Sequence, residues 1–235
     1  MGKRKLIKFE EMKTFPNVFQ PPVNDILNHD HALKGRWAAE VFHNSRPIVL
    51  ELGCGKGEYT VGLAKKYPEK NFIGIDIKGA RIWTGASEAL REGLNNVVFL
   101  RTRIELMEAF FSAGEISEIW LTFPDPQLKR RRWKKRLIAP SFLNIYNRFL
   151  SRGGIIHLKT DCRQLYEYTL NLLKGNGIQP VLATENLYAS GIQDDVAAIQ
   201  TFYEQQYLAA GLNIHYLRFI PGIVEHFIDL TDEEH

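Results

Sequence analysis

Short apolar runs alternate with amphipathic stretches through the middle of the chain. The apolar runs lie at residues 48–54, 71–77, 97–102, 118–123 and 154–160. Apolar residues recur at helical spacing over residues 59–68, 79–94, 104–114, 140–153 and 161–177. Short apolar runs bounded by glycine, proline or acidic residues are typical of buried strands. Because strands and helices alternate, the pattern predicts a parallel sheet that is covered on both faces.

The alternation changes near the C-terminus. Residues 178–186 and 213–222 have strand-like patterns, and a short helix is expected near 201–211 between them. Two late strands with a short, irregular connection can form an antiparallel pair at a sheet edge. The predicted fold is therefore α/β, a Rossmann-like doubly wound seven-stranded sheet with one antiparallel edge strand and helices on both faces.

The first 45 residues lack this alternation. They start with a basic stretch and pass through the proline-containing segment "FPNVFQPPVND" to a plausible helix over 25–43. Aromatic residues spaced among prolines indicate an extended segment that packs on a surface. We predict an N-terminal extension over residues 1–45 and one domain over residues 46–235.

Composition allows a full core, since 45% of the 235 residues are hydrophobic. The net charge is only +3, but residues 129–136, "KRRRWKKR", hold seven cations and no acid. Such a block indicates a surface that faces a polyanion. Cys54 and Cys162 form neither a disulfide framework nor a metal-spaced cluster, so we expect reduced thiols, a cytoplasmic location and no metal. No apolar run approaches the ~18 residues that a membrane span needs.

A glycine turn follows the first apolar run, in "ELGCGKGE" at residues 51–58. Its spacing differs from the G-x-G-x-x-G that binds a pyrophosphate, and Glu51 before it would repel such a group. An acid there suits a cationic or amine-bearing cofactor. Asp76 ends the next apolar run, where an acid can accept hydrogen bonds from ribose hydroxyls. A tight turn without a ligand is the plain alternative.

The order of acid, glycines and acid resembles the class I S-adenosylmethionine-dependent methyltransferases. In that family the glycine turn holds the amino-acid end of the cofactor, and the second acid holds the ribose. A dinucleotide-dependent dehydrogenase is the rival interpretation of such a turn.

A third acid, Asp125, lies between two prolines in "WLTFPDPQLKRRRWKKRL". It follows the apolar run 118–123, and the carboxyl ends of strands in such sheets face the ligand crevice. The prolines stiffen this approach, so we expect a held carboxylate beside the cofactor. The alternative is an Asp that only caps a turn. The cations behind it would then form a collar that binds RNA phosphates, and Trp133 would stack on a base or anchor the loop.

Four separated motifs resemble those of the tRNA (guanine-N7)-methyltransferases. They are "VLELGCGKGEYT", "FPDPQLKRRRWKKRL", "HLKTD" at 157–161 and "TFYEQQYLAAGLNIHYLRF" at 201–219. The resemblance implies that residues 46–235 form a class I methyltransferase domain with S-adenosyl-L-methionine as its cofactor. It implies that Asp125 is catalytic and that the cofactor is bound by Glu51, Gly53, Gly55, Gly57, Asp76, Arg103 and Asp125. The substrate-binding residues that it implies are Lys129, Asp161, Thr201, Phe202, Tyr203 and Glu204.

The charge pattern adds six expected contacts with the RNA backbone, from Arg130, Arg131, Arg132, Lys134, Lys135 and Arg136. Asp161 is also placed to cap the helix that follows it. Two positions depart from the family pattern. Arg103 stands where the family has an acid, and Glu105, two residues on, is the alternative. Gln127-Leu128 replaces a Trp-Pro pair.

The resemblance implies methyl transfer to N7 of a guanosine in tRNA, at position 46 of the variable loop. N7 has an in-plane lone pair and no proton, so we expect the rate to be raised mostly by alignment and desolvation of the reactants. We expect tRNA as partner, no membrane, no obligate protein partner, and a monomer or homodimer. Three alternatives stay open: a small-molecule methyltransferase, a non-catalytic RNA-binding module, and a subunit that needs a partner protein.

Overall fold

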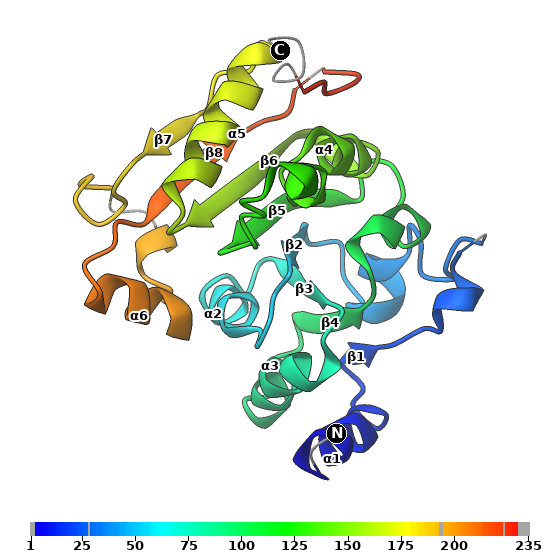
Figure 1. Ribbon diagram of the computed structural model, residues 1–235. Coiled ribbons are helices and arrows are strands. Elements are labelled where there is room, and N and C mark those ends of the chain that lie inside the picture. The colour runs from blue at the N-terminus through cyan, green and yellow to red at the C-terminus, as the bar shows by residue number, and fades with distance from the viewer. Residues whose placement is uncertain (1–2, 28, 193–194, 223, 230–235) are drawn as a thin grey trace. The chain divides into compact units, whose positions relative to one another are not determined.

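The computed structural model describes residues 3–27, 29–192, 195–222 and 224–229. The chain divides into two compact units, Met1–Ile116 (unit 1) and Ser117–His235 (unit 2) (Figure 1). In the described part of the chain, no helix combines the length and the hydropathy that a bilayer span requires.

Unit 1 is built on four parallel strands. Their order is β1 (Val18–Phe19), β4 (Val97–Arg101), β3 (Asn71–Asp76) and β2 (Ile48–Leu52). Every residue of β2 and β3 is buried, as continuous apolar runs predict. The helices α2 (Glu58–Lys66) and α3 (Gly79–Arg91) pack on these strands, and the 3₁₀ helix η3 (Ile104–Ala109) replaces the longer helix expected over 104–114.

The first 45 residues contribute to unit 1 more than an appendage would. The helix α1 (Lys3–Met12) packs on α3, and β1 pairs with β4. Trp37 is fully buried, and its Nε1 donates to the carbonyl of Phe110 at 2.8 Å. The continuous helix expected over 25–43 is wrong, because Gly35 takes a left-handed φ of 74°. The described residues of this stretch form the end of the 3₁₀ turn η1 (Val23–Asp25) and the π-helical turn η2 (Trp37–Val41). The boundary at residue 45 stays a prediction.

Unit 2 has strands in the order β5 (Ile116–Thr122), β6 (Leu150–Thr160), β8 (His215–Phe219) and β7 (Leu182–Thr184). Its helical segments are η4 (Arg130–Lys135), α4 (Pro140–Asn147), α5 (Arg163–Gly175), η5 (Asp195–Ala197) and α6 (Phe202–Ala209). The strand β8 runs antiparallel to both β6 and β7. The helix α5 packs on β6 and β8, and α4 packs on β6 (Figure 1).

The predicted α/β class is confirmed, and two details of the strands differ. The described residues hold eight strands, because the segment with prolines contributes the two-residue strand β1. Proline cannot donate to a strand ladder, so a segment rich in proline is not expected to form a strand. The short edge strand β1 was therefore not predicted. The reversed strand β8 is interior, between β6 and β7, so the outer position in unit 2 belongs to β7.

Candidate active site

The glycine turn between β2 and α2 has three left-handed residues. Gly53, Gly55 and Gly57 have φ values of 76°, 57° and 74°. A Cβ on Gly57 would lie 2.6 Å from Cε1 of Phe99, so Gly57 is needed for close packing as well as for conformation. A Cβ on Gly55 would meet nothing nearer than 3.9 Å, so one side of the turn is open to a ligand.

Two carboxylates hold the backbone here, one in the glycine turn and one in the helix α2 that follows it. Asp76 accepts from the backbone N–H of Gly55 at 3.0 Å and from that of Lys78 at 2.7 Å. Glu51 accepts from the backbone N–H of Thr60 at 2.8 Å and from the Thr60 hydroxyl. The structure therefore brings together the two acids and the glycines that the sequence singled out.

The pKa of Cys54, within the glycine turn, depends on the charges of Glu51 and Asp76. Burial, together with the nearby charges of Glu51 and Asp76, holds the pKa of the Cys54 thiol well above its usual value. The thiol stays protonated, and the charges of Glu51 and Asp76 contribute a negative potential at the turn. Such a potential favours a cationic ligand over a pyrophosphate.

Arg103 follows β4 by two residues. In the sheet register Arg101 stands beside Asp76, so Arg103 lies past the same strand ends as the acid. Its guanidinium is 3.5 Å from the carboxylate of Glu105, and both side chains are more than half exposed. An exposed pair of this kind contributes little stability. The cofactor role of Arg103, and the alternative role of Glu105, stay predictions.

In unit 2, Asp125 lies in a conformationally unusual loop. Phe123 and Gln127 on either side of Pro-Asp-Pro have left-handed φ values of 48° and 47°, which are uncommon for residues other than glycine. The backbone N–H of Phe123 donates to the carbonyl of Lys159 at 2.7 Å, and that of Gln127 donates to Asp125 Oδ1 at 3.0 Å. Asp125 thus forms the turn that we named as its alternative role, and the residue is exposed.

The basic segment after this loop divides into two kinds of residue. Six cations are exposed: Lys129, Arg130, Arg131, Arg132, Lys134 and Lys135. Arg136 is only 3% exposed, so the predicted contact of Arg136 with an RNA backbone does not fit the structure. Trp133 anchors the segment, because its Nε1 donates to the Leu128 carbonyl at 3.3 Å and its ring packs against Tyr168.

Asp161 follows β6 and is partly buried. The expectation that it caps α5 is wrong, because the residue at the cap position is Cys162 and no side chain caps this helix. Burial raises the pKa of Asp161. The pKa of Tyr207 is also raised, mainly by burial and further by the charge of Asp161. The Tyr207 ring lies 5.6 Å from that of Phe123, so these contacts connect Asp161, α6 and the loop of Asp125. Tyr207 was missed, although it stands one helical turn after Tyr203.

The segment Thr201–Glu204 begins α6 and has two buried and two exposed members. Thr201 and Glu204 form a capping box. Glu204 has no exposed surface; it is 2.7 Å from Lys159 Nζ and accepts from the Tyr188 hydroxyl at 2.7 Å. The predicted contact of Glu204 with a base would require this carboxylate to leave those partners, so in the structure its role is structural. Phe202 and Tyr203 are 47% and 44% exposed.

Lys159 is a second residue that the sequence reading missed. It is fully buried, and its Nζ also donates to the carbonyl of Val196 at 2.6 Å. Burial lowers its pKa, and Glu204 opposes that shift. A lysine inside the mostly apolar run 154–160 was the available signal.

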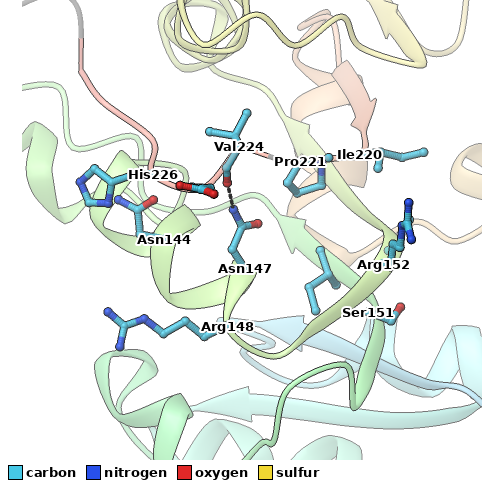
Figure 2. Close-up of a pocket in the computed structure, with 14 residues that line it drawn as sticks. Asn144, Asn147, Arg148, Ser151, Arg152, Ile220, Pro221, Val224 and His226 are labelled. Atoms are coloured by element: carbon cyan, nitrogen blue, oxygen red, sulfur yellow. Dashed lines mark hydrogen bonds between the residues drawn. The ribbon is translucent and has the colours of Figure 1, made fainter.

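A cavity of about 440 Å³ lies elsewhere in unit 2, at the start of β6 and past the end of β8 (Figure 2). Asn147 donates to the carbonyl of Val224 there at 2.9 Å. Asp161 follows the other end of β6, so this cavity is separate from the predicted substrate residues. Arg148 and Arg152 point away from each other in Figure 2, so they do not converge on one anion.

Comparison with known proteins adds a family and a fold. Residues 45–217 match a family model described as "Putative methyltransferase". A Bacteroides thetaiotaomicron protein named tRNA (guanine-N(7)-)-methyltransferase is 52% identical over 93% of this chain and 86% of its own length. A Porphyromonas gingivalis protein of the same name is 54% identical over 90% of this chain and 87% of its own.

The solved structure of the 16S rRNA methyltransferase KamB resembles this chain with a TM-score of 0.59. The match covers 77% of this chain and 91% of that one, at 14% sequence identity. At this identity the likeness concerns the fold, and it agrees with the α/β class.

Proposed function

Because the chain belongs to the tRNA (guanine-N(7)-)-methyltransferase family, we propose that it transfers a methyl group from S-adenosylmethionine to N7 of a guanosine in tRNA. The observation that carries this proposal is the identity of 52% and 54% to two proteins of that name over at least 90% of the chain. The family resemblance further suggests position 46 of the variable loop as the target.

The residues of unit 1 fit this cofactor. S-Adenosylmethionine carries a sulfonium and an ammonium group, and the acids around Cys54 give a negative potential. The turn is open at Gly55, where backbone can approach a ligand. Asp76 already accepts two backbone hydrogen bonds, but a carboxylate has about four acceptor sites and can still bind ribose hydroxyls. When bound, the cofactor supplies an electrophilic methyl group.

The protein's own chemical contribution is orientation and charge. Guanine N7 needs no general base, so the residues around it have to hold the base and exclude water. The methylated base gains positive charge, and a fixed carboxylate stabilises such charge. We assign this role to Asp125, whose loop is stiffened by two prolines and flanked by two left-handed residues. Asp161 is the second acid of unit 2 that can accept from guanine N–H groups.

The tRNA is the partner that explains the remaining exposed groups. Phe202 and Tyr203 offer aromatic surface for an unstacked base. The six exposed cations of the segment 129–135 suit phosphates, whose neutralisation releases counterions. We propose a class I methyltransferase domain over residues 46–235 that acts as a single chain in the cytoplasm, where it meets tRNA.

The decisive experiment uses the purified chain, labelled cofactor and unmodified tRNA transcripts. Borohydride–aniline cleavage should map N7-methylguanosine to position 46, and a transcript with adenosine at that position should take up no label. Label on another atom or nucleotide would contradict the proposal.

The same assay separates the three alternatives. Transfer to small molecules in a tRNA-free extract would indicate a small-molecule enzyme. Binding of tRNA without any transfer would indicate a non-catalytic module. Activity that appears only after extract proteins are added would indicate a partner-dependent subunit.

A further inference from the structure

We propose that Arg136 is a positioning residue, which holds the Asp125 loop through the Pro126 carbonyl and does not bind tRNA phosphates. The inference deepens the proposed function, because it rests on the role assigned to Asp125. It separates Arg136 from the six cations that precede it, although the sequence presents all seven as one basic block.

Burial is the first observation. Arg136 is 3% exposed, whereas the six preceding cations are exposed. Its Nη1 is fully buried and has no hydrogen-bond partner in the described part of the chain, so a phosphate cannot reach this nitrogen while the loop is folded. Burying a guanidinium is costly unless its surroundings compensate. The groups that surround Arg136 therefore have to account for its inward position.

The hydrogen bond to the Asp125 loop is the second observation. Arg136 Nε donates to the carbonyl of Pro126 at 2.9 Å, across ten residues of chain. Pro126 is the residue directly after Asp125. The bond closes the intervening basic segment into a loop whose two ends are joined. A second, local hydrogen bond within the loop is the one that Gln127 donates to Asp125 itself.

Two aromatic rings hold the guanidinium in place. Its Cζ lies 4.2 Å from the ring centroid of Tyr168 in α5 and 4.8 Å from that of Trp133 in η4. The planar guanidinium stacks on aromatic faces, which an ammonium does less well. The Tyr168 hydroxyl in turn donates to Asp229 Oδ2 at 3.2 Å. A continuous set of contacts thus runs from Asp229 through Tyr168 and Arg136 to Pro126.

The loop requires such support. The left-handed conformations of Phe123 and Gln127 are unfavourable for residues other than glycine and persist only where surrounding contacts enforce them. Asp125 is exposed and lies between these two residues. Holding a reacting group to within an ångström can be worth about 100-fold in rate, so a loosened loop lowers turnover even if every reacting group is present.

The test compares Arg136→Lys and Arg136→Gln with Arg131→Gln, a matched variant at an exposed cation of the same segment. Initial rates at saturating cofactor give kcat and KM for tRNA, and filter binding at several salt concentrations gives the salt slope of tRNA affinity. We expect both Arg136 variants to lose about tenfold in kcat with an unchanged salt slope. Arg131→Gln should weaken tRNA binding and reduce the slope by about 0.7–0.9.

Arg136→Lys is the discriminating variant, because it keeps the charge and loses the stacked planar donor. Wild-type kcat in Arg136→Lys, or a salt slope in Arg136→Gln that falls as in Arg131→Gln, would overturn the proposal. Thermal unfolding checks that each variant folds. If Arg136→Gln does not fold, Tyr168→Leu takes its place, because it removes a ring that packs against the guanidinium. Tyr168→Leu should show the same loss in kcat, and a wild-type kcat in that variant would also overturn the proposal.

Asp125→Asn distinguishes failure of this inference from failure of the proposed function. Full activity in Asp125→Asn would remove the role of Asp125 itself. Loss of activity in Asp125→Asn, together with an Arg136 variant that behaves as a phosphate contact, would remove only the positioning role.

Discussion

Gly57→Ala is expected to have the larger effect on stability, and Gly55→Ala the larger effect on cofactor binding. Both glycines have left-handed φ, which costs an alanine about 1–2 kcal/mol. Only at Gly57 would the new methyl group also overlap its surroundings, at 2.6 Å and 2.8 Å from two atoms of the buried Phe99 ring. Overpacking of a buried site adds about 1–3 kcal/mol. Gly57→Ala should therefore destabilise unit 1 by about 2–5 kcal/mol, and Gly55→Ala by only about 1–2 kcal/mol.

Among folded molecules, Gly55→Ala should weaken cofactor binding more than Gly57→Ala does. The Cβ of Gly55→Ala would occupy the open side of the turn, so we expect the Kd for S-adenosylhomocysteine to rise about tenfold. Urea unfolding measures the first effect, and calorimetry of the folded variants measures the second. Equal destabilisation by the two variants would refute the packing argument. An unchanged Kd in Gly55→Ala would refute the placement of the cofactor at this turn.

Three further predictions concern unit 2. Asp125→Asn should lower kcat about 100-fold and leave the calorimetric Kd for S-adenosylhomocysteine within about threefold, because it removes charge stabilisation of the product base; equal losses in both would mean that Asp125 only shapes a pocket. Asp161→Asn should raise the Tm, since burial raises the pKa of Asp161 and so disfavours its ionised form in the folded state at neutral pH. The same variant should lower kcat. A lower Tm would show that the carboxylate is stabilising. Lys159→Met should cost about 3–5 kcal/mol in urea unfolding, because Glu204 stays buried without its ion-pair partner, and adding Glu204→Leu should recover part of the loss. A double variant no more stable than Lys159→Met would contradict this account.

Local patterns were sufficient for the parts of the molecule that depend on neighbours in sequence. The glycine turn requires φ values that only glycine adopts without strain, so its place after β2 is readable from the letters. Asp76 ends the next strand, and parallel strands end on the same side of their sheet, so its approach to Gly55 could be expected as well.

Contacts between distant residues determine whether each charged side chain is exposed or buried. The reading of residues 129–136 as one basic surface agrees with the exposure of six of its cations and is wrong for Arg136. The residues of the block alone do not distinguish Arg136, because its guanidinium packs on Tyr168 in α5, whose hydroxyl in turn donates to Asp229. The same holds for Glu204, which turns inward because Lys159 and Tyr188 meet it there.

The α/β alternation, the acid–glycine–acid order and the motifs of a tRNA methyltransferase family could all be read from the letters, since each is carried by short spacings along the chain. Which carboxylates and cations are exposed, and which are buried with partners, became evident only from the folded chain. Desolvation explains the difference: whether a charge stays exposed or is buried with partners depends on atoms that folding brings from elsewhere in the chain.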